Sequence, residues 1–464
     1  MSLLVFLVIL LIITGLVAGL LRGFAWLSGG LVVALLGWLA VWMWRLPLEE
    51  SVTVWGRVIF LEQTNSLLKF TFQLTPFARV PILLMLAWGA LFALIAALVQ
   101  VERSFIPAIP FLLAALVVFL AAQPLLYAPF WLMLVAVLMG IIAQGNKPRP
   151  ARAALRTLLA PLLAFPLFLF SAWVFSQSAV AAEDPVLWTR AWQALLVGML
   201  IFTSPVPLHG WIVALGEAAS PFAGAFLVGI WQIAVYAFLR RLLFAYPSIT
   251  DFVDPGVWLP WIAVVQMVWA GVFMFGSQRL GQLWGYLLLW MFGAGFLAWG
   301  LTGELGSEAI LWLFMVAPLV LVLAAAGLQS IVHRFGENPD YSQLQGATDR
   351  LPLSSLGFIA GGLFLLGWPL GALFPMRLAT YQVAEYRAGN IFLWTMLAVA
   401  LAVMGLIRAV RYLARPVGDV SLQRESRIVA WTIGGLLLVG GAIALNPGLL
   451  NAVAEQMLVW FNML

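Results

Sequence analysis

The sequence has no cysteine and contains only two histidines, His209 and His333. Without cysteine the chain cannot form a disulfide, use a thiolate nucleophile or ligate an iron–sulfur cluster through its own thiolates. Two histidines that lie far apart in the sequence do not supply the ligand set of a histidine zinc site. We therefore expect no metal and no cofactor bound by this chain.

Charge is also scarce, because 9% of the 464 residues are charged and 64% are hydrophobic. Soluble domains average about 25% charged residues, so the composition predicts a protein whose solvent is lipid. We ascribe the net charge of +5 to cytoplasmic loops, which favour Lys and Arg, and expect no nucleic-acid partner. The acidic residues fall in loops or at span ends, and no nucleophile–base pair is apparent, which disfavours a membrane enzyme.

Apolar runs of about 20 residues, the length that crosses a bilayer, predict an all-α polytopic membrane protein with about fourteen spans. The predicted spans are residues 3–21, 24–44, 79–100, 104–122, 124–143, 155–176, 189–206, 213–239, 256–276, 281–301, 308–330, 353–375, 391–413 and 427–446. The first run is interpreted as a span and not as a signal peptide. The 23 tryptophans exceed what interfacial belts need, so several should pack between helices.

Loops after odd-numbered spans contain more Lys and Arg than loops on the other side. The positive-inside rule then predicts non-cytoplasmic termini, in what we expect to be a prokaryotic plasma membrane. The loop Arg45–Ala78 is long enough for a hairpin or an amphipathic cap. The tail Asn446–Leu464 is expected to form an interfacial helix.

Proline-rich breaks mark the seventh and twelfth spans, with Pro205 and Pro207 at the first and Pro369 at the second. Interrupted helices at matching positions indicate two inverted five-helix repeats, here spans 4–8 and 9–13, with an ion path near the breaks. The predicted organisation is a three-span segment (1–100), a first repeat (101–242), a second repeat (243–415), and a last span with the tail (416–464).

Four polar residues are candidates for an ion path: His209, Glu217, Gln232 and Arg377. His209 could give access to protons, because the unperturbed pKa of histidine is near neutrality, or could be structural and bond loop carbonyls. Glu217 is interpreted as a carboxylate at a helix start, stabilised by the helix dipole, with a proton-path role as the alternative.

Gln232 falls in the middle of a predicted span and must find a hydrogen-bond partner. That partner could lie on a hydrated axis or on a neighbouring helix. Arg377 is the strongest functional candidate, because a cation near the membrane interior marks a functional site by default. Its alternative is to extend to the outer interface. Ser220 before Pro221 predicts an N-cap, and Gln266 is interpreted as an ordinary helix contact.

The segment from residue 207 to 241 resembles a known family. It contains Pro207-Leu208-His209-Gly210-Trp211, then Glu217-Ala218-Ala219-Ser220-Pro221, then Tyr236 and Arg240. These residues are similar to a motif of the proton-antiporter-like membrane subunits of respiratory complex I, with relatives in Mrp antiporters and membrane-bound hydrogenases. Leu366-Gly367-Trp368-Pro369 is similar to the broken twelfth span of that family. The resemblance implies fourteen spans, a lipid environment and other membrane subunits as partners.

The resemblance also implies that the family's line of ionisable residues is mostly lost. The fifth-span glutamate of the family falls at Leu132, the lysine before the first break at Phe202, and the eighth-span lysine at Gln232. The twelfth-span position keeps a charge at Arg377, but arginine does not release its proton at physiological pH. The chain's own proton path is therefore predicted to be degenerate.

Three functions stay open at this point. The first is an antiporter-like subunit that couples redox chemistry in partner subunits to proton or cation translocation, as in NADH:quinone oxidoreductase. The second is a structural member of the same family without transport. The third is a stand-alone cation/proton transporter, or a lipid-phase enzyme, with a shallow resemblance to the family.

Overall fold

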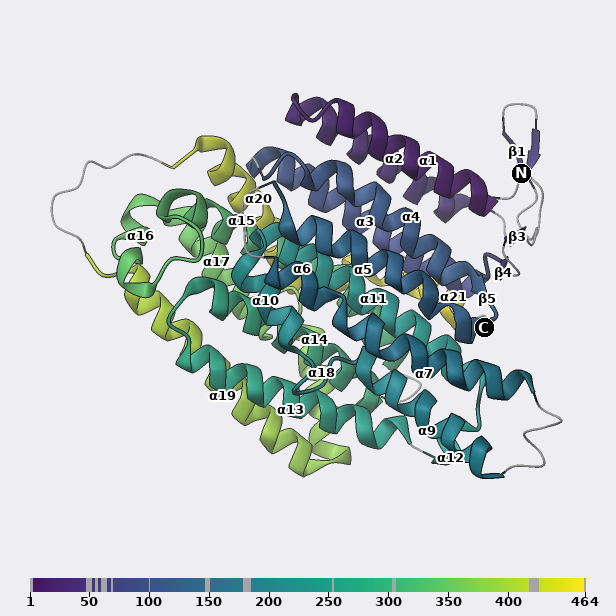
Figure 1. The fold of residues 1–464 in the computed structure, drawn as a ribbon. Coiled ribbons are helices and arrows are strands. Elements are labelled where there is room, and N and C mark those ends of the chain that lie inside the picture. Colours follow the sequence, from purple (N-terminus) through teal and green to yellow (C-terminus); the bar gives the residue numbers. More distant parts are fainter. Residues whose placement is uncertain are drawn as a thin grey trace.

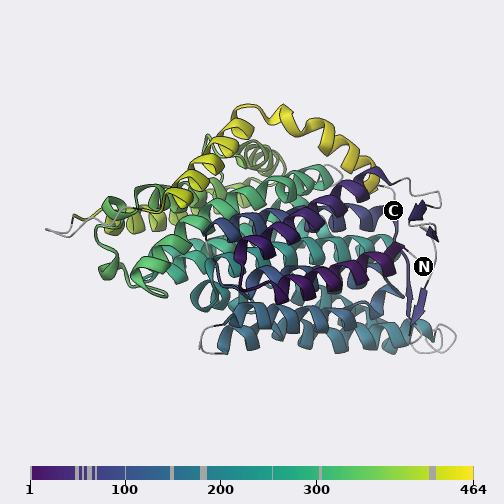
Figure 2. The ribbon, with the colours of Figure 1, turned by 90° about the horizontal axis from the view of Figure 1, so that it is seen from above.

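The computed structural model describes residues 3–46, 52–54, 57–59, 65–67, 70–99, 101–146, 151–177, 185–252, 254–302, 306–416 and 425–462. Its long helices run side by side along one common direction, and both chain ends lie at the same end of the bundle (Figure 1). The view from above shows the same elongated bundle, with the C-terminal helices crossing one side of it (Figure 2). This architecture confirms the predicted all-α fold.

Helices account for most of the described residues. Their bounds are α1 Leu3–Leu20, α2 Ala25–Arg45, α3 Pro76–Val99, α4 Phe105–Ala121, α5 Pro129–Gln144, α6 Arg152–Thr157, α7 Leu159–Ser176, α9 Pro185–Phe202, α10 Gly210–Ala218, α11 Pro221–Ala245, α12 Ile249–Phe252, α13 Pro255–Gly276, α14 Leu280–Thr302, α15 Gly306–Phe335, α16 Ala347–Arg350, α17 Pro352–Leu365, α18 Phe374–Arg387, α19 Gly389–Leu413, α20 Arg427–Leu445 and α21 Asn451–Asn462. Short 3₁₀ turns η1 Leu125–Tyr127, η3 Tyr341–Leu344 and η4 Pro447–Leu450 connect some of them.

Twelve of the described helices are long and apolar enough to cross a membrane, and α4 and α17 are shorter apolar helices. Together they occupy the positions of the fourteen predicted spans, although the number that crosses a bilayer stays a prediction. The predicted span 213–239 is wrong in detail, because the chain breaks after Ala218 and restarts at Pro221. Ser220 ends this break as the N-cap of α11, and its hydroxyl accepts from the Ala223 N–H, which confirms the predicted cap.

Helix α11 lies at the centre of the bundle. Every residue of its most apolar window is buried, and α14, α15 and α3 follow it in burial. Its neighbours approach closely through small residues, since a Cβ added at Gly229 would lie 2.0 Å from the ring of Trp88. Trp88, Trp231, Trp284 and Trp290 are all buried inside the protein, which confirms that several tryptophans pack between helices.

Small strands cover the end of the bundle near the termini. The described residues of the loop Arg45–Ala78 form two antiparallel hairpins, of strands β1 Val52–Val54 with β2 Arg57–Ile59 and β3 Asn65–Leu67 with β4 Phe70–Phe72. Strand β5 Ala122–Gln123 extends the second hairpin, so the predicted hairpin is present twice. The tail helix α21 packs against α3 and α15.

Candidate functional site

The first helix break separates α9 from α10. Residues 203–209 leave helical geometry, with Pro205 and Pro207 inside this stretch. Ser204 takes a left-handed backbone conformation, φ 51°, and its buried hydroxyl accepts a hydrogen bond of 3.0 Å from the indole Nε1 of Trp211. We name residues 203–209, with the two helix ends beside them, break 1.

Break 1 leaves the backbone carbonyls of Thr203 and Ser204 without a hydrogen-bond partner inside a helix. A side chain of α13, Gln266, donates to both of them. The side-chain Nε2 of Gln266 lies 2.8 Å from the oxygen of Thr203 and 2.6 Å from the oxygen of Ser204. Gln266 is fully buried. A buried amide in an apolar bundle must be bonded, and here its two N–H groups satisfy two carbonyls that the break has freed.

His209 is the last residue before α10. It is 8% exposed, its ring stands edge-on to Trp269 at 5.8 Å, and its Nδ1 is buried without a hydrogen-bond partner. The structural alternative, a histidine bonded to loop carbonyls, is therefore not what this nitrogen does. The His209 ring packs edge-on against Trp269 of α13.

Glu217 lies in the last turn of α10, which corrects the predicted position at the start of the eighth span. The predicted stabilisation by the N-terminal dipole of the eighth span stays a prediction, and Glu217 is placed instead at the C-terminal end of α10, where the dipole is unfavourable for a carboxylate. The cause is the additional break before Pro221, which the apolar pattern of the sequence did not reveal. Helix α10 is held close to α14, because a Cβ added at Gly216 would lie 2.2 Å from the Cα of Gly285.

Aromatic rings fill the interior beside break 1. Phe202, the last residue of α9, is fully buried and stacks on Phe168 with ring centres 5.1 Å apart. Phe238 and Trp231 of α11 meet the Phe202 ring edge-on at 5.8 and 6.1 Å. Leu132 of α5 is also fully buried. Phe202 and Leu132 are therefore packed into an apolar core, and their match to titrating positions of the family stays a prediction.

Gln232 lies in the middle of α11 and is 3% exposed. Its Nε2 donates a hydrogen bond of 2.9 Å to the carbonyl oxygen of Phe292 on α14. Of the two alternatives from the sequence, the bond to a neighbouring helix is the one formed. The amide is held against α14 closely enough that a Cβ added at Gly295 would lie 2.2 Å from Nε2.

The second helix break separates α17 from α18 over residues 366–373, which we name break 2. Gly367 and Leu370 have left-handed backbone conformations, with φ of 84° and 70°. Pro369 and Leu370 are exposed, unlike the buried Ser204 of break 1. Gly367 allows a close approach, because a Cβ added there would lie 2.7 Å from Cγ of Arg377.

Arg377 is buried in α18 and 1% exposed, so the alternative of extending to the outer interface is wrong. Its guanidinium carbon lies 5.2 Å from the ring centre of Trp290 on α14. Its Nε and Nη2 have no hydrogen-bond partner, and no carboxylate of the described residues forms an ion pair with it. A buried cation without an anion is costly, and the aromatic face of Trp290 offsets part of this cost.

Among the hollows that the described residues form, one lies at the turn between α10 and α11 and one lies beside break 2. One, of about 280 Å³, is lined by Glu217 and Ser220 together with His333 on α15. The other, of about 340 Å³, lies between α15 and α18 beside Met376 and is mostly apolar. Neither is lined by any of the three positions at which the family's charge is lost. The hollows therefore do not connect Glu217 with the centre of α11.

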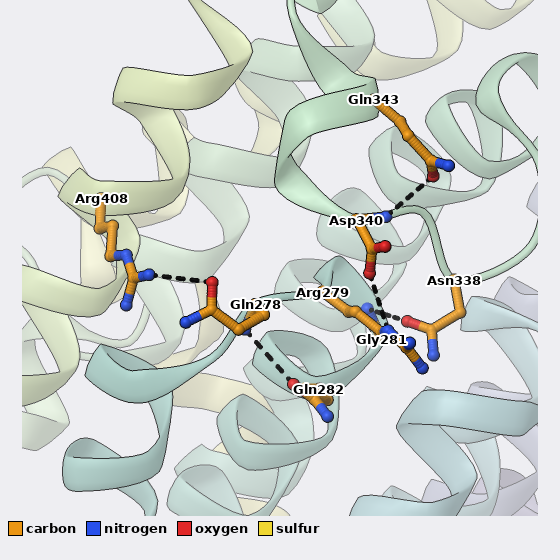
Figure 3. A network of polar contacts seen from close by, with 8 residues as sticks. All are labelled: Gln278, Arg279, Gly281, Gln282, Asn338, Asp340, Gln343 and Arg408. Carbon is orange, nitrogen blue, oxygen red and sulfur yellow. Dashed lines mark hydrogen bonds and ion pairs between the residues drawn. The ribbon is translucent and has the colours of Figure 1, made fainter.

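A polar network at the bundle end opposite the termini joins three elements (Figure 3). Arg279 Nε lies 2.8 Å from Asp340 Oδ1 and thereby links the α13–α14 turn to the segment after α15. Arg408 of α19 donates to Gln278 Oε1 at 3.1 Å. Nearby, burial raises the pKa of Tyr341 to about 12, which keeps this phenol neutral at physiological pH. The network fixes loops and contains no group placed inside the bundle.

The sequence did not identify two kinds of buried polar residue. Gln266 was interpreted as an ordinary contact, although an amide in the middle of the apolar segment 256–276 was a signal that it needed partners. Arg79 is 3% exposed and donates to the carbonyl oxygens of Met43 and Trp44 at 2.8 and 2.7 Å. Arg241 similarly donates to the carbonyl of Leu120. These arginines hydrogen-bond to carbonyl groups in the last turns of α2 and α4.

Sequence comparison finds distant relatives, and no family model matches the chain. A subunit N of NADH-quinone oxidoreductase from Streptomyces griseus is 26% identical over 262 residues, 55% of this chain and 46% of that protein. The subunit N from Geotalea uraniireducens is 27% identical over 285 residues, 60% of this chain and 59% of that protein. The chain thus matches about half the length of these curated relatives.

Solved structures show the same fold over nearly the whole chain. An archaeal membrane-bound sulfane sulfur reductase has a chain with a TM-score of 0.77 at 16% identity, covering 99% of this chain and 97% of that one. The Mrp complex of a Dietzia species gives 0.73 at 17% identity, covering 100% and 98%. Respiratory complex I from Thermus thermophilus gives 0.69 at 16% identity, covering 96% and 98%.

Sequence relatives and fold agree with the motif that led to the resemblance. The broken helices at residues 203–209 and 366–373 lie where that motif placed them. The apolar packing of Leu132 and Phe202 sets this chain apart from a protein with a continuous ionisable line. The chain has the fold of membrane subunits in complex I, Mrp and sulfane sulfur reductase assemblies, and is distantly similar in sequence to subunit N of NADH-quinone oxidoreductase.

Proposed function

We propose that this chain serves as an antiporter-like membrane subunit in a redox-driven, complex I-type assembly, and that its own proton path is interrupted. In this assembly the partner membrane subunits carry the redox groups. The chain contributes the helical body and its contacts, and does not translocate protons by itself. The relatives named as subunits of NADH-quinone oxidoreductase support the assignment to such an assembly.

One observation supports the interruption of the proton path. Phe202 is enclosed by the rings of Phe168, Phe238 and Trp231, where a titrating group would need water or a polar partner. Proton transfer needs groups that bind and release a proton. Gln232 cannot titrate, and its amide is bonded to the Phe292 carbonyl.

Arg377 does not restore the path. Arginine stays protonated at physiological pH, so it cannot pass a proton on. A fixed positive charge inside the bundle also repels cations, as positive groups do in pores that exclude them. The buried charge, 5.2 Å from the Trp290 ring, therefore acts as a barrier to protons and cations in the second half of the chain.

The experiment has two independent arms. The purified chain in liposomes, driven by an imposed pH gradient or membrane potential, should give proton and cation fluxes no greater than protein-free liposomes. A family member that keeps its ionisable line is the positive control. Cation exchange by this chain at a rate comparable with the control would contradict the interrupted path.

The assembly is tested separately by purification from native membranes. We expect the tagged chain to bring other membrane subunits and a redox-active fraction with it. Recovery of the chain alone, with transport activity, would favour the stand-alone transporter. Recovery in a complex without any flux through this chain would support the proposal.

The orientation and the repeats are part of the same proposal. We infer non-cytoplasmic termini in a prokaryotic plasma membrane, and inverted repeats at 101–242 and 243–415 between the segments 1–100 and 416–464. Because the chain has no cysteine, single cysteines can be introduced without a background. A membrane-impermeant maleimide added from outside should label Asn451→Cys and not Ser342→Cys; the reverse pattern would overturn the orientation.

A further inference from the structure

Break 1 creates a pair of backbone acceptors inside the protein. Thr203 and Ser204 follow the last residue of α9, and no backbone N–H of the described residues donates to either carbonyl oxygen. Both residues are fully buried. At membrane depth, carbonyls freed by an unwound helix must be bonded to protein or line a polar site.

The Gln266 amide meets both of these oxygens with one nitrogen. Nε2 lies 2.8 Å from the Thr203 oxygen and 2.6 Å from the Ser204 oxygen. Only the NH₂ group of the amide can donate to two carbonyls, so the chemistry fixes its orientation. The amide Oε1 is buried and has no hydrogen-bond partner, so the amide is held at break 1 through its nitrogen alone.

Carbonyl oxygens of an unwound membrane helix are ligands for monovalent cations in transporters. The Gln266 nitrogen occupies the point at which such a cation would meet the two carbonyls. We propose that the carbonyl oxygens of Thr203 and Ser204 form a monovalent-cation site that the Gln266 amide keeps closed. This inference rests on the geometry of break 1 and is independent of the proposed assembly.

Gln232 provides a matched comparison within the same bundle. It is also a buried glutamine that donates from Nε2 to a backbone carbonyl, at 2.9 Å. Its acceptor, Phe292, lies inside the continuous helix α14, so removal of the Gln232 side chain leaves no pair of free carbonyls. Loss of Gln232 should therefore destabilise the protein without creating a cation site.

The test compares Gln266→Ala, Gln266→Leu and Gln232→Ala with the wild type. Thermal unfolding in detergent, followed by tryptophan fluorescence, is measured in sodium, potassium or choline chloride at constant ionic strength. For Gln266→Ala we expect the midpoint to rise on the order of 3 °C in sodium or potassium relative to choline, increasing with concentration as linked binding requires. The wild type, Gln266→Leu, which fills the space, and Gln232→Ala should show no cation-specific shift.

A second variant keeps the inference testable if Gln266→Ala does not fold. Gln266→Glu preserves the side-chain shape and places a carboxylate beside the two carbonyls, so its stability at neutral pH should depend on sodium or potassium. Equal midpoints in all three salts for both Gln266→Ala and Gln266→Glu would overturn the inference. An equal cation-specific gain in Gln232→Ala or in the wild type would overturn it as well.

Discussion

Both helix breaks unwind the backbone within an otherwise apolar bundle, but they differ in charge. The buried polar groups beside break 1 are neutral, and the buried group beside break 2 is a cation. At break 1 the freed carbonyls are bonded by the neutral amide of Gln266, and the Ser204 hydroxyl accepts from an indole N–H. At break 2 the turn is exposed at Pro369, and the buried group beside it is the Arg377 guanidinium, with Nε and Nη2 unbonded. Break 1 is held by neutral groups, whereas break 2 lies beside a buried charge that cannot titrate at physiological pH.

This difference shows what a broken membrane helix needs. An unwound segment requires hydrogen-bond partners, but those partners need not carry charge or exchange protons. Break 1 can therefore keep its shape while the family's lysine position is occupied by Phe202, which stacks on Phe168. The shape of the break and its capacity for transport are separable properties.

The largest effect is expected from the aromatic core of break 1. Phe202→Ala removes a fully buried ring that contacts three other rings, and large-to-small changes of this kind cost about 3–5 kcal/mol. Phe130→Ala, at a ring that is 45% exposed on α5, is the matched control and should change little. Thermal unfolding in detergent measures both. Similar midpoints for the two variants would contradict the view that packing holds break 1 together.

Arg377→Met should change stability in the opposite direction. Replacing a buried charge that has no anionic partner by an apolar side chain of similar length should stabilise the fold, by about 1–4 kcal/mol on the scale of buried ionic groups. Arg387→Met is the control, because this exposed arginine of the same helix donates to the Leu301 carbonyl at 3.0 Å and should give no gain. A lower midpoint for Arg377→Met would show that a partner engages the charge.

The smallest effects should come from the left-handed residues of the two breaks. Gly367→Ala forces a side chain into φ 84° against the Arg377 stem, which should cost about 1–2 kcal/mol. Ser204→Gly relieves φ 51° but loses the acceptor for Trp211, a loss of about 0.5–1.5 kcal/mol, so the net change should be near zero. The same unfolding assay compares them. A larger loss for Ser204→Gly than for Gly367→Ala would reverse this ranking.

Much of the fold was predictable from local sequence. Long apolar runs specify membrane helices because lipid offers no partner for backbone polar groups. Proline has no backbone N–H to donate within a helix, so Pro205 and Pro207 predicted break 1. Ser220 before Pro221 predicted a helix start. The additional break between α10 and α11 was not predicted, because residues 213–239 are mostly apolar and only the Ser220-Pro221 cap marked it.

The sequence by itself determined the fold class and the positions of both breaks, because these follow from residue type and local pattern. The tertiary structure decided what the remaining polar residues do. Gln266 hydrogen-bonds to Ser204, 62 positions earlier in the sequence, and Gln232 hydrogen-bonds to Phe292, 60 positions later. The Arg377 guanidinium lies over the ring of Trp290. Burial and partner choice depend on such distant contacts, and no local pattern encodes them.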